Sequence, residues 1–64
     1  MIIEETENAY DMHVTEQELE DGTPVVELYQ VNGSGVESFI GMDKHQAAQL
    51  IEVLQRWIDG EEIE

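Results

Sequence analysis

The sequence predicts an α+β protein, a three-stranded antiparallel meander followed by one C-terminal helix packed on the sheet. Three observations support this fold. Residues 43–60 repeat apolar side chains at helical spacing, and much of residues 9–40 alternates apolar and polar side chains with a period of two. Turn signals at Asp21-Gly22 and Asn32-Gly33 divide this alternating region into three strands. No linker interrupts the 64 residues, so we expect a single domain, 1–64.

The helix is predicted from its ends as well as from its apolar stripe. Asp43 and Gln46 have the spacing of a capping box, and Gly60 is placed to take the left-handed conformation after the last turn. The apolar stripe consists of Ala47, Leu50, Ile51, Leu54, Trp57 and Ile58. Within this stripe we expect burial of Leu50, Ile51, Leu54 and Trp57. The expected sheet partners are Val26 or Leu28, Ile40 and the face of Tyr10, Met12 and Val14.

The strands are expected at residues 9–16, 25–31 and 36–42. The first of these has the clearest alternation, with Tyr10, Met12 and Val14 on one face. Ile2 and Ile3 form either a short edge strand or a loose end, and we expect residues 1–8 and 61–64 to be frayed.

The strand at residues 25–31 carries apolar side chains on both faces. Val26 and Leu28 share one face, and Val25, Tyr29 and Val31 share the other. A strand that is apolar on both faces is usually covered on both, and one helix can cover only one. A domain this small with no cysteine also needs another source of stability. The sequence therefore predicts a homodimer with an interface at Val25, Tyr29 and Val31.

Charge is the strongest feature of the composition. Sixteen Asp and Glu residues stand against only Lys44 and Arg56, for a net charge of −14. Such a chain repels nucleic acid, so we expect no direct contact with it. No signal peptide or membrane span is evident in the sequence, which favours a cytoplasmic location, in the host cytoplasm if a phage encodes the chain.

No residue pattern indicates catalysis. His13 and His45 are expected to be solvated, cysteine is absent, and the serines lack a nucleophile motif. The spacing of a calcium-binding loop is also absent. We therefore expect no enzymatic activity, no cofactor and no metal site.

The acids near the end of the first predicted strand form a candidate partner-binding set. Alternate residues Glu16, Glu18 and Glu20 would lie on one face at intervals of about 6.6 Å, twice the strand rise. Successive phosphates along one DNA strand are separated by about 6–7 Å. These residues, together with Asp21, are our candidates for contact with a basic partner. The alternative is that the acids serve solubility and block aggregation at a strand edge.

In its small size, acidity, lack of cysteine and element order, the chain resembles the phage-encoded inhibitors that imitate DNA. That resemblance assigns no roles to residues. The element order is also similar to that of the transcriptional coactivators that bind single-stranded DNA and pair through their helices. Residues 9–40 of this chain contain no Lys or Arg, so DNA binding is not shared.

The resemblance to DNA-imitating inhibitors implies a small acidic interaction protein, an inhibitor or regulator from a phage or mobile element. Such a protein would occupy the basic, nucleic-acid-binding surface of a partner protein. The alternative is a homodimeric accessory or structural module.

Overall fold

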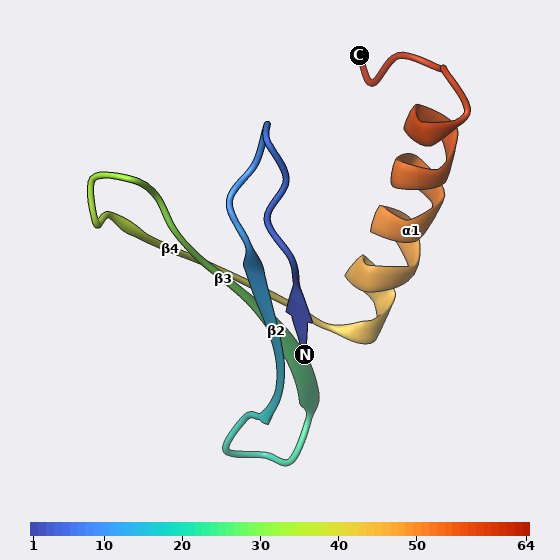
Figure 1. The fold of residues 1–64 in the computed structure, drawn as a ribbon. Coiled ribbons are helices and arrows are strands. Elements are labelled where there is room, and N and C mark those ends of the chain that lie inside the picture. The colour runs from blue at the N-terminus through green and yellow to red at the C-terminus, as the bar shows by residue number, and fades with distance from the viewer.

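Four strands and one helix form the computed structural model, which describes residues 1–64 (Figure 1). The elements are β1 (Ile2–Ile3), β2 (Met12–Glu18), β3 (Pro24–Val31), β4 (Glu37–Met42) and α1 (Lys44–Ile58). The strands are neighbours in chain order, and each pair is antiparallel. The α+β class and the order of strands before helix are confirmed, but the sheet has four strands and not three.

The additional strand is β1, and the expectation that the chain starts with a frayed segment was wrong there. Ile2 pairs with His13 and Ile3 with Met12. The loop between the strands is turned by Thr6, whose hydroxyl oxygen accepts hydrogen bonds from the N–H groups of Asn8 and Ala9, both at 3.1 Å. The polar run before β2 is therefore a chain reversal that brings the N-terminal segment back to the sheet. The same turn delays the start of β2 from the predicted residue 9 to residue 12.

The strand register separates the sheet into two faces of different character. Opposed residues of antiparallel strands share a face, and successive residues alternate between faces. One face, which we call the aliphatic face, carries Met12, Val14, Val26, Leu28, Ile40 and Met42. The other, which we call the aromatic face, carries His13, Val25, Glu27, Tyr29, Val31, Glu37 and Phe39. The predicted division of β3 into two apolar sides is confirmed.

The helix begins and ends as predicted. The Gln46 N–H donates to the Asp43 carboxylate at 2.9 Å, and the Gln46 side chain accepts from the Asp43 N–H at 3.4 Å, completing the capping box. Gly60 has a φ of 98°, and its N–H donates to the carbonyl of Trp57. The N–H of Glu61 donates to the carbonyl of Arg56, so the helix closes with a Schellman motif.

The expectation that α1 packs along the sheet was wrong. The helix contacts only β3 and β4, and it points away from the sheet (Figure 1). Most of its apolar stripe faces solvent: Leu54 is 41% exposed, Trp57 59%, Ile51 69% and Ile58 70%. The reason lies in the connection, because Asp43 alone separates Met42 of β4 from Lys44 of α1. An extended Asp43, held in the capping box, does not let the chain reverse over the sheet.

A single copy of the chain consequently has no core. None of its 64 residues is buried. Its accessible surface is 5681 Å², whereas a compact 7.3 kDa protein exposes about 4200 Å². The radius of gyration is 13.7 Å, against about 11 Å for a compact chain of this length. The elements are formed, but the packing that normally stabilises such elements is missing within one molecule.

The capping box gives a test of how strongly Asp43 fixes the start of α1. Asp43→Ala removes the side-chain acceptor of the Gln46 N–H, and should lower the free energy of unfolding by about 0.5–2 kcal/mol. Asp43→Asn keeps an acceptor oxygen and should stay close to wild type. Urea denaturation at one fixed protein concentration measures both, and equal losses for the two variants would contradict the capping role.

Candidate protein-interaction surfaces

Twelve of the sixteen acidic side chains gather at three places in the fold. One group lies in the loop between β1 and β2, a second at the end of β2 and in the following turn, and a third after α1. The loop and the turn lie at opposite ends of β2 (Figure 1). The acids of residues 1–21 therefore form two separate groups. The groups are Glu4, Glu5, Glu7 and Asp11; Glu16, Glu18, Glu20 and Asp21; and Asp59, Glu61, Glu62 and Glu64.

The predicted partner-binding residues make up the second group, which we call the acidic turn. Glu16 and Glu18 alternate along β2 on the side of the aliphatic face, opposite Val26 and Pro24. Glu20 lies beyond the end of β2, so the even spacing expected along one strand extends over Glu16 and Glu18 only. All four side chains of the acidic turn are exposed. The structure thus places them together at one end of the sheet, on a strand and the turn that follows it.

Asp21 is held in place by the turn itself. Its carboxylate accepts a hydrogen bond from the Thr23 N–H at 2.9 Å. Hydrogen bonds from the Thr23 side chain and then from its backbone lower the pKa of the Asp21 carboxyl below its ordinary value of 3.8. Asp21 therefore presents a fixed and fully ionised carboxylate at neutral pH.

Almost none of the acidic charge is neutralised within the chain. The one contact within ion-pair distance joins His13 Nε2 to Asp11 Oδ2 at 3.5 Å. Lys44 and Arg56, both on α1, form no ion pair with any Asp or Glu. The carboxylates of the acidic turn are consequently free to meet cations from another molecule.

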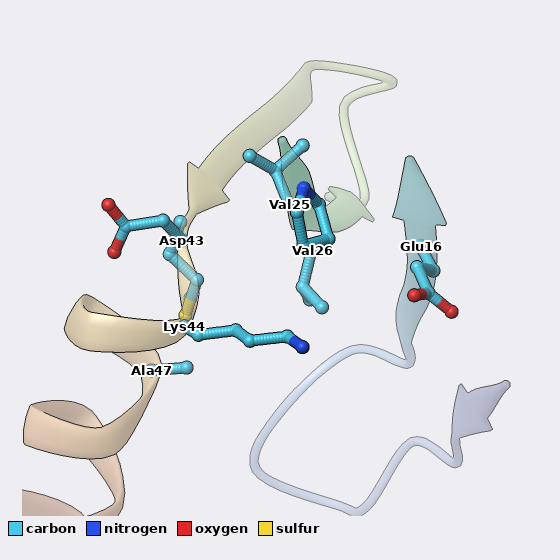
Figure 2. Close-up of a pocket in the computed structure, with 8 residues that line it drawn as sticks. Glu16, Val25, Val26, Asp43, Lys44 and Ala47 are labelled. Carbon is cyan, nitrogen blue, oxygen red and sulfur yellow. The ribbon is translucent and has the colours of Figure 1, made fainter. Parts of the chain in front are cut away.

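A small pocket lies where α1 leaves the sheet. Its volume is about 60 Å³, and Figure 2 shows Val25 and Val26 of β3, Glu16 of β2 and Lys44 and Ala47 of α1 around it. Lys44 extends toward the side of the pocket where Glu16 lies, without forming an ion pair. The pocket is too small for a substrate-sized molecule. It marks the place where the aliphatic face and the apolar stripe of α1 diverge.

The aromatic face contains the predicted dimer-interface residues, Val25, Tyr29 and Val31. The Tyr29 ring lies 4.9 Å from the ring of Phe39 and 5.7 Å from that of His13, measured between centroids. Its hydroxyl donates to Glu37 at 3.2 Å. Loss of solvation, followed by the hydrogen bond and the charge of Glu37, raises the pKa of Tyr29 above its ordinary value of 10.0.

Polar side chains interrupt the apolar residues of the aromatic face. Gln17 donates to the carboxylate of Glu27 at 3.4 Å across the strands. This face is therefore half-solvated and satisfied by its own hydrogen bonds. The aliphatic face has a continuous set of apolar side chains, and it is the more apolar of the two.

Sequence reasoning did not predict that the aliphatic face and the apolar stripe of α1 would be uncovered by one another. Most residues of each were identified correctly, although Tyr10 lies before β2 and Met42 belongs to the aliphatic face, and the two surfaces were expected to cover one another. The signal that could have shown otherwise is the single residue between Met42 and the capped start of the helix.

His45 lies exposed in the first turn of α1. No group of three or more His, Asp or Glu side chains is placed to hold a metal ion. The one helix does not have the length and apolar character needed to cross a membrane.

No protein-family model matches the sequence, and no curated protein or solved structure is significantly similar to it. The acidic turn and the uncovered apolar surfaces are thus the features on which a functional proposal can be based.

The Asp21–Thr23 turn provides a test of the acidic turn. Thr23→Val removes the side-chain donor and should raise the pKa of Asp21 toward 3.8. Because the pKa of Asp21 is lowered in the folded chain, its contribution to stability is present above pH 3.8 and is lost as pH falls through the folded-state value.

Side-chain carboxyl titration by NMR measures this change. Thr6→Val, which breaks the corresponding turn of the β1–β2 loop, serves as the control and should leave the Asp21 midpoint in place. An Asp21 midpoint unchanged by Thr23→Val would show that the side chain of Thr23 does not hold this carboxylate.

Proposed function

We propose that this chain is a small acidic interaction protein that binds the basic, nucleic-acid-binding surface of a partner protein. It would act as an inhibitor or regulator encoded by a phage or mobile element. The proposal is carried by one observation, that the acidic charge is unpaired. The chain has sixteen Asp and Glu carboxylates, and none of them lies within ion-pair distance of a Lys or Arg of the chain. A protein that used its acids for internal stability would pair them.

The acidic turn is the surface best suited to such a partner. Four carboxylates fall within six residues, and the β2–β3 hairpin fixes their positions. Glu16 and Glu18 are two residues apart on one strand, a spacing of about 6.6 Å, which is close to that of neighbouring DNA phosphates. Unpaired charge of this density attracts a basic surface over long range and speeds association.

A second candidate function is a homodimeric accessory module whose acids serve solubility. The uncovered aliphatic face and the exposed stripe of α1 favour it, since both need a partner surface. The two candidates differ in what the acids do. In the first the acidic turn makes a specific contact, and in the second any distribution of the same charge serves equally well.

A competition experiment separates the two candidates. The immobilised chain is incubated with bacterial lysate at low salt and then eluted with duplex DNA. The interaction protein should retain nucleic-acid-binding proteins that DNA releases, whereas resin carrying polyglutamate of equal charge should retain a different, broader set. Identical sets on the two resins would refute the proposal.

The acidic turn can be tested by charge removal at constant side-chain volume. Glu16→Gln, Glu18→Gln and Glu20→Gln together should slow association with a retained partner by about tenfold at low salt, because electrostatic steering is lost. The fold should be kept, since repulsion between the acids decreases. Stopped-flow or surface-binding kinetics over a range of salt concentrations gives the on-rate and its salt dependence.

The matched control removes the same charge elsewhere. Glu61→Gln, Glu62→Gln and Glu64→Gln change the net charge equally, but lie after α1 and outside the acidic turn. This triple variant should keep most of the wild-type on-rate. Equal slowing by the two triple variants would indicate that total charge, and not the acidic turn, drives the association.

A further inference from the structure

Two apolar surfaces of this chain match one another but are not in contact. One is the aliphatic face of the sheet, on which Ile40 is 58% exposed. The other is the apolar stripe of α1, on which no residue is buried. Within one molecule they meet only near the start of the helix, around Val26 and Ala47 (Figure 2). The one-residue connection at Asp43 keeps the rest of the helix away from the sheet.

We propose that a second copy of this chain covers both surfaces. In this dimer the apolar stripe of α1 from each copy lies on the aliphatic face of the other. A two-fold axis satisfies both contacts at once, because residues that meet in one direction also meet in the other. The proposal does not rest on the proposed function, since it concerns how the apolar surfaces are covered and not whether the acids bind a basic partner.

The surface area of the chain fits such a pair. One copy exposes about 1500 Å² more than a compact protein of its mass. Two copies that covered this excess would bury about 3000 Å² in total, which lies within the range of about 2000–5000 Å² found for obligate homodimers. The excess surface of one copy is therefore of the size that an obligate interface with one further copy of this chain would bury.

The lengths of the two surfaces also agree. The 15 residues of α1 span about 22 Å. The eight residues of β3, at the centre of the aliphatic face, span about 26 Å. One helix of the partner can thus lie along the strand over nearly its whole length.

Charge favours the helix of another copy as the occupant of the aliphatic face. The helix α1 is the one element with more basic than acidic residues, Lys44 and Arg56 against Glu52. The charged side chains on the aliphatic side of the sheet are Glu16 and Glu18 of β2. Sheet-on-sheet contact would bring the Glu pairs of two copies together, whereas helix-on-sheet contact sets them against the least acidic part of the chain.

This interface differs from the one expected at Val25, Tyr29 and Val31. Those residues lie on the aromatic face, where Glu27 and Glu37 are hydrogen-bonded to neighbouring side chains. The aromatic face would remain on the outside of the proposed dimer, half-solvated as it is in one copy.

The first test is the mass of the wild-type chain in solution. Sedimentation equilibrium at micromolar concentration should give twice the 7.3 kDa of one chain. Trp57, the sole tryptophan, is 59% exposed in one copy, so its emission should be blue-shifted in the dimer and should move to the red on dilution. A folded particle of 7.3 kDa, a larger closed assembly, or a chain that stays unfolded until another protein is added would each overturn the proposal.

The second test locates the interface. Because the chain has no native cysteine, only the introduced thiols can react. Leu54→Cys and Ile40→Cys are prepared as separate chains with tags of different size, mixed, and treated with a short bis-maleimide. The mixed product should dominate, because the helix of one chain meets the sheet of the other. Ser34→Cys, in the distant β3–β4 turn, is the control and should remain uncoupled. If Leu54→Cys couples chiefly with itself, the helices meet one another and the arrangement is wrong.

A third variant tests the role of the connection. Insertion of a five-residue Gly/Ser linker between Met42 and Asp43 gives the helix the freedom to return to its own sheet. The proposal predicts a folded monomer with half the wild-type mass and a buried Trp57. A dimer unchanged by the insertion would show that the short connection is not what keeps α1 from packing on its own sheet.

Discussion

The whole structure depends on a single residue, Asp43, between the last strand and the helix. A connection of one residue, locked in a capping box, fixes the direction in which α1 leaves the sheet. Four strands and a helix then form with good local geometry, and yet no side chain is buried. Burial of apolar surface is the main favourable term in folding, and within one chain the sheet and the helix supply little of it to one another. The well-formed start of the helix and the lack of a core within one chain thus both follow from the short connection at Asp43.

The arrangement separates two kinds of surface that would otherwise interfere. Apolar side chains occupy the middle of the sheet and one stripe of the helix, while most of the acids lie in the loop, the acidic turn and the C-terminal tail. In the proposed dimer the partner helix would lie against Glu16 and Glu18 of the acidic turn, but it would leave the acids of the β1–β2 loop and of the tail in water. Association through the apolar surfaces would thus leave most of the acidic charge unpaired, and one chain can carry both a packing surface and a charged one.

The sequence predicted what depends on neighbouring residues and failed where distant segments must meet. The Asp43–Gln46 capping box, the Gly60 terminus and the two sides of β3 follow from local hydrogen bonding and periodicity, and all were found. The β1 strand was only one of two alternatives, and the other was preferred, because two residues carry no period and the pairing depends on a turn at Thr6. The predicted packing of the helix was wrong because an apolar stripe indicates that a surface is to be covered, but does not indicate which molecule covers it.

The absence of any buried side chain within one molecule has a consequence for the lifetime of the protein in a cell. A chain without its own core opens readily, and proteases act on the opened form. Association holds such a chain closed only when its concentration exceeds the dissociation constant of the complex. In the proposed dimer, scarce copies would therefore be degraded and abundant copies would persist, so the amount of intact protein would rise steeply with synthesis above a threshold instead of in proportion to it.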